Sequence, residues 1–225
     1  MNKVFVSWSG GKDSCFAGYR ATRQGLKISH LLNMVNLDAK QSWFHGIPLE
    51  LMQMQSQAMG VPLIQRRTTM ADYETDFKDA ILAFKKEGVV GGVFGDIDLE
   101  VHREWVERIC QQVEVDAHLP LWGLSQENIL KELIESGFEA VVLVAKADLI
   151  DGDWLGQKIN LDFFSYLSEL RRTRDITFCG EAGEYHTFVV DGPLFKQRLE
   201  ILESRKVLRE GYWRLEILKG ELRDK

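Results

Sequence analysis

Residues 4–14 read Val-Phe-Val-Ser-Trp-Ser-Gly-Gly-Lys-Asp-Ser, an apolar run that ends in a glycine-rich loop and then continues into a helical pattern. The adjacent glycines, Gly10 and Gly11, let backbone N–H groups approach an anion closely, and they tolerate positive φ angles. The following helix contributes the positive end of its dipole, and Lys12 adds a mobile charge. The stretch therefore predicts a strand, a phosphate-binding loop and a helix.

The spacing of this loop also excludes two common alternatives. A Walker A loop needs four residues between its first Gly and Gly-Lys-Ser/Thr, and a dinucleotide fingerprint needs Gly-x-Gly-x-x-Gly. Neither pattern occurs here, and the hydroxyls of Ser9 and Ser14 instead flank the two glycines. The loop resembles the pyrophosphate-binding loop of the N-type ATP pyrophosphatases, which release the β- and γ-phosphates of ATP together. A plain Gly-Gly turn is the alternative interpretation.

Composition limits the class of protein and its partners. The chain has 225 residues, of which 45% are hydrophobic and 28% charged, as is ordinary for a globular protein of one or two domains. A net charge of −6 gives no general attraction to nucleic acid or to anionic membranes. The chain starts with a strand-like segment, without the pattern of a signal peptide, and no stretch approaches the roughly 18 apolar residues of a membrane span. We expect a cytoplasmic protein with no membrane or nucleic-acid partner.

The cysteines indicate neither disulfides nor a zinc site. Cys15, Cys110 and Cys179 are isolated and odd in number, and none belongs to a Cys-x-x-Cys motif. We expect Cys15 and Cys110 to be buried thiols. Cys179 stands next to an informative motif, but packing is a commoner role for a lone cysteine than nucleophilic attack.

Short β-rich runs alternate with helical patterns through the first two thirds of the chain, which predicts a mostly parallel sheet. The expected strands lie near residues 3–8, 28–36, 61–66, 89–95 and 139–145. The expected helices lie at residues 14–24, 46–59, 72–87, 99–113, 125–136 and near 160–172. Glycines at 25, 60, 88 and 137 follow helical patterns, where a left-handed C-cap favours glycine. Two β-like runs around Glu210-Gly211 predict a hairpin.

A second polar cluster lies at residues 179–195, where three glycines accompany Glu181, Glu184, His186 and Asp191. Two carboxylates and an imidazole can orient a metal-bound phosphate, hold an ammonium ion, or act as acid and base near neutral pH. The alternative is a polar loop whose carboxylates accept hydrogen bonds from neighbouring N–H groups. The density of charged residues favours the functional interpretation.

With both clusters in place, the chain resembles the diphthine–ammonia ligase family. That family combines Ser-Gly-Gly-Lys-Asp-Ser with Gly-Glu-x-Gly-Glu-x-His-Thr and Asp-Gly-Pro-Leu-Phe, all of which occur here in order. Segments between these motifs are similar too, namely residues 45–48, 95–97 with Arg103, 120–122, 137–140 and 154–156. The resemblance covers nearly the whole chain.

The resemblance implies an α/β fold: a Rossmann-like parallel sheet of the HUP type, flanked by helices, with a smaller C-terminal α/β substrate domain. The expected domains are a PP-loop ATP-binding domain at residues 1–120 and a substrate-binding, catalytic domain at residues 121–225, with the active site between them. Candidate residues for binding ATP are Ser9, Gly10, Gly11, Lys12, Asp13, Ser14, Asn36, His45, Gly95, Asp96 and Arg103. Candidate catalytic residues are Lys12, Asp13, Glu181, Glu184 and His186, and candidate Mg²⁺ ligands are Asp13 and Asp96.

The reaction implied by the resemblance is a two-step ligation. A substrate carboxylate is adenylated by ATP with Mg²⁺, pyrophosphate leaves, and ammonia displaces AMP. In the family's named reaction the carboxylate belongs to diphthine on elongation factor 2 and the product is diphthamide. The same chemistry on another small carboxylate or amide of cofactor metabolism, sulfur transfer to tRNA, and a non-catalytic ATP sensor are the alternatives. Several tryptophans, including Trp43, Trp105 and Trp154, leave a homodimer as an open expectation.

Overall fold

The computed structural model describes residues 1–37 and 47–225, which form two compact units. Unit 1 comprises Met1–Ser9 and Asp13–Gly123, and unit 2 comprises Gly10–Lys12 and Leu124–Lys225. Three residues of the glycine-rich loop therefore belong to the same unit as the C-terminal half of the chain. Within the described ranges, the structure contains no helix that is both long and apolar enough to cross a membrane.

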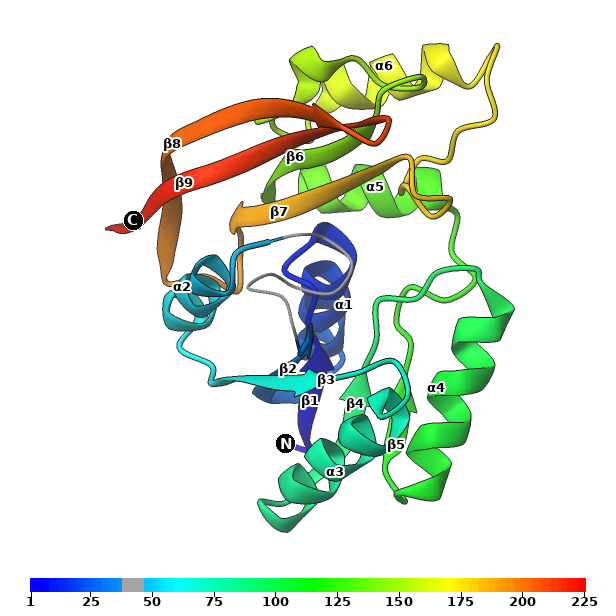
Figure 1. Ribbon diagram of the computed structural model, residues 1–225. Helices are drawn as coiled ribbons and strands as arrows, with labels where there is room; N and C mark the ends of the chain where they lie inside the picture. The colour runs from blue at the N-terminus through cyan, green and yellow to red at the C-terminus, as the bar shows by residue number, and fades with distance from the viewer. Residues whose placement is uncertain (38–46) are drawn as a thin grey trace. The chain divides into compact units, whose positions relative to one another are not determined.

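Unit 1 is built on a five-stranded parallel sheet with the order β3-β2-β1-β4-β5 (Figure 1). Its strands are β1 (Lys3–Ser7), β2 (Lys27–Asn36), β3 (Leu63–Thr68), β4 (Val89–Val93) and β5 (Asp116–His118). Its connecting helices are α1 (Lys12–Arg23), α2 (Leu49–Met59), α3 (Tyr73–Lys86) and α4 (Glu100–Gln112). Because all five strands run in one direction, the loops that follow them leave the sheet at the same edge.

Both faces of this sheet are covered. Three consecutive residues of β1, Val4, Phe5 and Val6, are completely buried, as expected for a central parallel strand. Phe5 belongs to a cluster with residues of α3 and α4, including Phe77 and Ile109. Those two helices therefore cover one face, and right-handed crossover connections direct α1 and α2 to the other.

Unit 2 contains a four-stranded antiparallel sheet with the order β7-β6-β9-β8. Its strands are β6 (Glu139–Lys146), β7 (Tyr185–Asp191), β8 (Gln197–Arg209) and β9 (Tyr212–Asp224), and its helices are α5 (Gln126–Glu135), α6 (Leu161–Leu170) and the short η1 (Gly152–Trp154). The long hairpin of β8 and β9 is orange and red in Figure 1. Its two turn residues, Glu210 and Gly211, have φ angles of 51° and 78°, as a two-residue type I′ turn requires.

Most predicted elements are confirmed, with shifts of a few residues at their ends. For example, Gly60 ends α2 with a left-handed φ of 69°. The strand predicted at residues 139–145 exists, but its assignment to the parallel sheet was wrong, because β6 pairs antiparallel with β7 and β9. The outer position in the parallel sheet belongs instead to the three-residue β5, and neither β5 nor β7 was predicted.

Candidate functional site

Two serines of unit 1, one at each end of the glycine-rich loop, are hydrogen-bonded to each other. Ser9 follows β1, and Ser14 lies in the first turn of α1 with 4% of its surface exposed. The backbone N–H of Ser9 donates a hydrogen bond to the Ser14 hydroxyl at 3.3 Å, and the two hydroxyl oxygens lie 3.0 Å apart. Gly10 between them has a positive φ of 79°. The serine pair therefore fixes both ends of the loop that glycine allows to turn.

The end of β4 reaches the start of α1. A Cβ atom added to Gly95 would lie 2.9 Å from the backbone carbon of Asp13 and 2.9 Å from the nitrogen of Ser14. No side chain fits at that distance, so glycine is required for this close approach. The structure therefore brings together the predicted residues Asp13, Gly95 and Asp96 at the edge of the sheet where the strands end.

Asp96 is a partly buried carboxylate, with 22% of its side chain exposed, and its Oδ1 lies 3.3 Å from Nδ1 of His102. Burial raises the pKa of Asp96, and the negative charge of Asp13 raises it further, although His102 opposes both effects. A divalent cation near the two carboxylates would relieve their repulsion, and Mg²⁺ commonly binds proteins through one or two carboxylates and substrate phosphates. This pair of residues therefore fits Mg²⁺, although no group of three or more His, Cys, Asp or Glu side chains among the described residues forms a metal-binding cluster.

Lys12 is a buried basic residue of unit 2, with only 3% of its surface exposed. Its ammonium group donates a hydrogen bond to the carbonyl oxygen of Cys179 and lies 5.1 Å from the centre of the Tyr185 ring. Its backbone N–H donates to the hydroxyl of Thr187 at 3.0 Å. The N–H of Val189 in turn donates to the carbonyl oxygen of Gly10 at 3.0 Å. The loop residues are thus held along β7, next to the second polar cluster.

Glu184 organises the turn that precedes β7. Only 2% of its surface is exposed, and its two carboxylate oxygens accept hydrogen bonds from the N–H groups of Thr177 at 2.5 Å and Ala182 at 2.9 Å. The N–H of Glu181 is held by the Thr177 hydroxyl at 2.9 Å. These bonds fix the backbone around Cys179, whose carbonyl oxygen accepts the hydrogen bond from the ammonium group of Lys12. Glu184 therefore positions the turn, whatever further role it has in chemistry.

His186 is a titratable group of the site whose pKa lies well below its usual value. It lies on β7 opposite Val144 of β6. Burial, together with the positive charges of Lys12 and Arg214, lowers its pKa to about 4, and Glu184 only partly opposes this shift. The imidazole is therefore neutral at pH 7 and available to accept a proton.

Three other predicted residues have different positions. Asn36 is the last residue of β2, opposite Thr68 of β3. Arg103 lies on α4, where its guanidinium pairs with Glu107 at 2.8 Å and lies 5.2 Å from the ring centre of Trp122. His45 lies outside the described residues. Of the two described residues, Asn36 lies directly at a strand end and Arg103 does not.

Sequence reasoning missed two residues that contact Lys12, namely Tyr185 and Thr187. Both precede Val189 at intervals of two along β7, so their side chains share one face of the strand. Recognising residues 185–191 as a strand would have revealed that face. Cys15 and Cys110 are buried as predicted, and Cys179 is buried too, where its thiol donates to the carbonyl oxygen of Gln126 at 3.4 Å.

The parallel sheet, the glycine-rich loop after β1 and the cluster on β7 together define a nucleotide-binding α/β protein with a second, antiparallel unit. Profiles described as the diphthamide synthase N-terminal domain and the diphthamide synthase C-terminal domain match residues 2–117 and 125–221. The chain belongs to the diphthamide synthase family.

Individual relatives agree with this assignment. The chain is 30% identical to diphthine–ammonia ligase of Rattus norvegicus over 228 residues, covering 92% of this chain and 85% of that protein. It is also 30% identical to diphthine–ammonia ligase of Homo sapiens, with the same coverage. Among solved structures, a predicted subunit of tRNA methyltransferase from Methanocaldococcus jannaschii aligns with a TM-score of 0.46 and 14% identity, over 86% of this chain and 98% of the other.

Proposed function

We propose that this protein is an ATP-dependent amide ligase that converts the carboxylate of diphthine to an amide, with release of AMP and pyrophosphate. The observation that carries the proposal is the buried Lys12 of a phosphate-binding loop held along β7, beside His186. The relatives' shared name supports the choice of diphthine and ammonia as substrates. The protein that bears the diphthine is elongation factor 2 in this proposal.

In the first step a carboxylate oxygen of the substrate attacks the α-phosphorus of ATP. A bond forms between that oxygen and phosphorus, and the bond to the pyrophosphate oxygen breaks. Several negative charges develop on the leaving pyrophosphate, and fixed donors stabilise such charge without having to reorganise. The proposed donors are the ammonium group of Lys12 and N–H groups of the loop other than those of Ser9 and Lys12, which already donate to Ser14 and Thr187.

In the second step ammonia attacks the acyl carbon, and AMP leaves with the electron pair of the broken carbon–oxygen bond. Ammonia is delivered as ammonium, so one proton must first be removed. His186 is our candidate acceptor, because its imidazole is neutral, and the negative charge of bound phosphates would raise its low pKa. Glu184 holds the turn before β7 in place. The nearby carboxylate of Glu181 is our candidate for binding the ammonium ion.

Asp13 and Asp96 are the proposed ligands of Mg²⁺. When bound, this ion would shield the phosphate charges of ATP. The remaining proposed ATP contacts are Asn36, His45, Gly95 and Arg103. Residues 1–120 and 121–225 then serve as the ATP-binding and the substrate-binding, catalytic domains.

The alternative functions have less support. Sulfur transfer requires reactive thiolates, but burial raises the pKa of Cys15 and raises that of Cys110 to about 12. A passive ATP sensor does not account for a neutral, buried histidine and a buried lysine in one cluster. Another small carboxylate remains the alternative that preserves the same chemistry.

The test is measurement of AMP and pyrophosphate release from ATP with Mg²⁺ and ammonium, using diphthine-bearing elongation factor 2 and a panel of small carboxylates. We expect both products to form in a 1:1 ratio, only with the diphthine-bearing protein. Release of AMP and pyrophosphate with a small carboxylate alone would show that the enzyme acts on a different substrate by the same chemistry. ATP binding without AMP formation would overturn the ligase proposal.

A further inference from the structure

Trp8, the residue that joins β1 to the glycine-rich loop, is buried and hydrogen-bonded at each of its polar groups. Its N–H donates to the carbonyl oxygen of Leu32 at 2.7 Å, which extends the pairing of β1 with β2. Its carbonyl oxygen accepts from the side-chain amide of Asn33 at 2.8 Å, and its indole N–H donates to the side-chain oxygen of Gln55 on α2 at 2.9 Å. All four residues belong to unit 1, so β2 and α2 together fix the start of the loop.

Asn33 is a polar side chain that packing does not explain. It is only 5% exposed, and its neighbours on β2, Leu32 and Met34, are buried apolar residues. Its side-chain oxygen Oδ1 has no hydrogen-bond partner among the residues that the structure describes. A buried polar atom without a partner destabilises the folded protein, and an apolar side chain would lack that atom. In the contacts described, what the amide provides in return is the hydrogen bond to Trp8.

The hydrogen bond from Asn33 fixes the first peptide group of the loop, which consists of the Trp8 carbonyl and the Ser9 N–H. The two groups point in opposite directions, because a trans peptide group is planar. Asn33 holds the carbonyl oxygen, while the N–H donates to the Ser14 hydroxyl at 3.3 Å. Residues of β2 and α1 therefore hold this plane from both sides. The chain turns directly afterwards, at Gly10, so a rotation of the plane would redirect the rest of the loop.

We propose that Asn33 is a positioning residue for phosphate binding: by holding the Trp8–Ser9 peptide group, it keeps the loop in its binding conformation before ATP arrives. This inference rests on the proposed function, in which the loop binds the phosphates of ATP. A loop that is ordered in advance loses less conformational freedom when it binds an anion. Asn33 acts through Trp8 and does not touch the nucleotide. The competing explanation is a purely structural role, which predicts a change in stability with an unchanged affinity for ATP.

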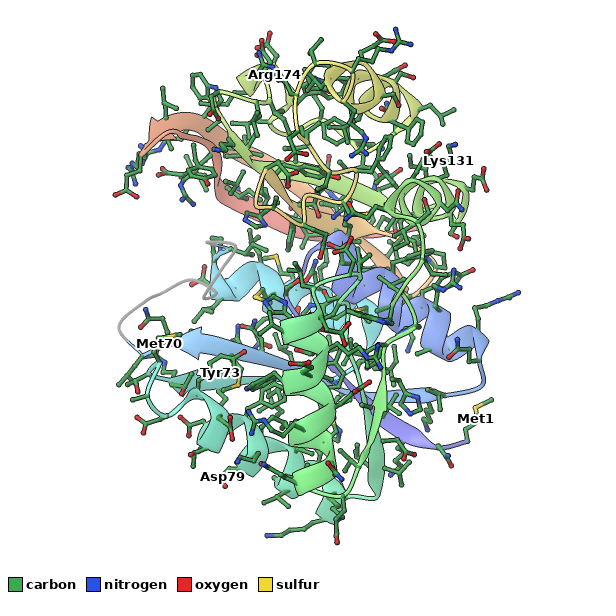
Figure 2. The ribbon with its side chains drawn as sticks, turned by 90° about the vertical axis from the view of Figure 1, so that its right-hand side faces the viewer. Met1, Met70, Tyr73, Asp79, Lys131 and Arg174 are labelled. Carbon is green, nitrogen blue, oxygen red and sulfur yellow. The ribbon has the colours of Figure 1, made fainter. Side chains whose placement is uncertain are left out.

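Asn33→Leu and the smaller Asn33→Ala both remove the amide, and Ser29→Ala is the matched control. Ser29 is also on β2 and donates to a main-chain carbonyl of β1, that of Val4 at 3.1 Å, but at the end of β1 next to Met1 (Figure 2). Calorimetry on the whole protein should show the dissociation constant of ATP with Mg²⁺ rising about tenfold in both Asn33 variants and by less than about twofold in the control. Wild-type affinity in a folded Asn33 variant, or an equal loss in the control, would overturn the proposal.

Steady-state kinetics separate this inference from the proposed function. In the AMP-release assay, both Asn33 variants should raise the KM for ATP about tenfold and leave the KM for ammonium unchanged, whereas a loss of folded protein would lower only the apparent kcat. If the wild type releases AMP and the KM for ATP does not change in either variant, the positioning role is wrong and the ligase proposal stands. If no AMP forms while both variants still bind ATP more weakly, the ligase proposal fails alone.

Discussion

The ammonium group of Lys12 donates a hydrogen bond to the carbonyl oxygen of Cys179, and both groups are buried. The two residues are 167 positions apart in the sequence, one in the glycine-rich loop and the other in the turn before β7. The cation that is proposed to stabilise pyrophosphate is therefore oriented by the backbone of the second polar cluster.

Lys12→Met should keep the aliphatic stem and remove the charge. We expect pyrophosphate release to fall 10²–10³-fold, as when one preorganised electrostatic donor is lost. The matched control is Lys131→Met, because Lys131 lies on α5 outside the proposed site, where its ammonium group pairs with Glu127 and lies 4.9 Å from the ring centre of Phe164. Activity of Lys12→Met within tenfold of wild type would contradict the proposed role.

Glu184→Gln should destabilise the protein by about 1–3 kcal/mol, because the amide nitrogen cannot accept the hydrogen bond that one carboxylate oxygen now accepts. Urea denaturation gives this value directly. Glu127→Gln on the surface of α5 is the control, and its effect should stay below about 1 kcal/mol. A Glu184→Gln protein with wild-type stability and no ligase activity would assign Glu184 to the chemistry instead.

His186 should make stability depend on pH in acid. Its pKa of about 4 in the folded protein lies below the ordinary 6.5, so the unfolded chain binds more protons between these values. The contribution is fully present above pH 6.5 and is lost as the pH falls toward 4, on the order of 3 kcal/mol in total.

His186→Gln removes this titration. Denaturation curves of both proteins from pH 4 to pH 7 should therefore show a free energy of unfolding that falls less steeply with acid in the variant. Parallel curves would show that His186 titrates normally in the folded protein.

Asp96→Asn tests the proposed magnesium ligand. We expect the Mg²⁺ concentration for half-maximal pyrophosphate release to rise about tenfold or more, since one of two carboxylates is lost. The free energy of unfolding of Asp96→Asn should equal or exceed that of the wild type, because burial and the charge of Asp13 both disfavour the ionised form of the Asp96 carboxyl group. Asp98→Asn, two residues further along the same loop and exposed, should leave the Mg²⁺ dependence unchanged.

The sequence predicted most elements of unit 1, with the exception of β5, but it did not predict how the sheet of unit 2 pairs. In unit 1 the helices α1, α2 and α3 are each followed within two residues by a glycine, so the helical periodicity and the helix-ending residues indicated the same boundaries. β6 is buried along almost its whole length, which is a pattern that a central parallel strand also shows. Its antiparallel pairing depends on β7, where polar residues such as His186 and Thr187 obscure the alternation.

The candidate site divides in the same way. Residues 9–14 could be recognised as a phosphate-binding loop, because glycine, lysine and serine at that spacing are typical of few other structures. The contacts of Lys12 with Thr187 and Tyr185 join distant parts of the chain, and no local pattern specifies such a pairing.

The assignment of Gly10–Lys12 to unit 2 has a practical meaning for protein engineering. A hybrid that joins residues 1–123 of one homologue to residues 124–225 of another would place a foreign tripeptide in the C-terminal unit. Shuffling experiments should therefore transplant positions 10–12 together with the C-terminal half, rather than cut the gene once at the apparent boundary.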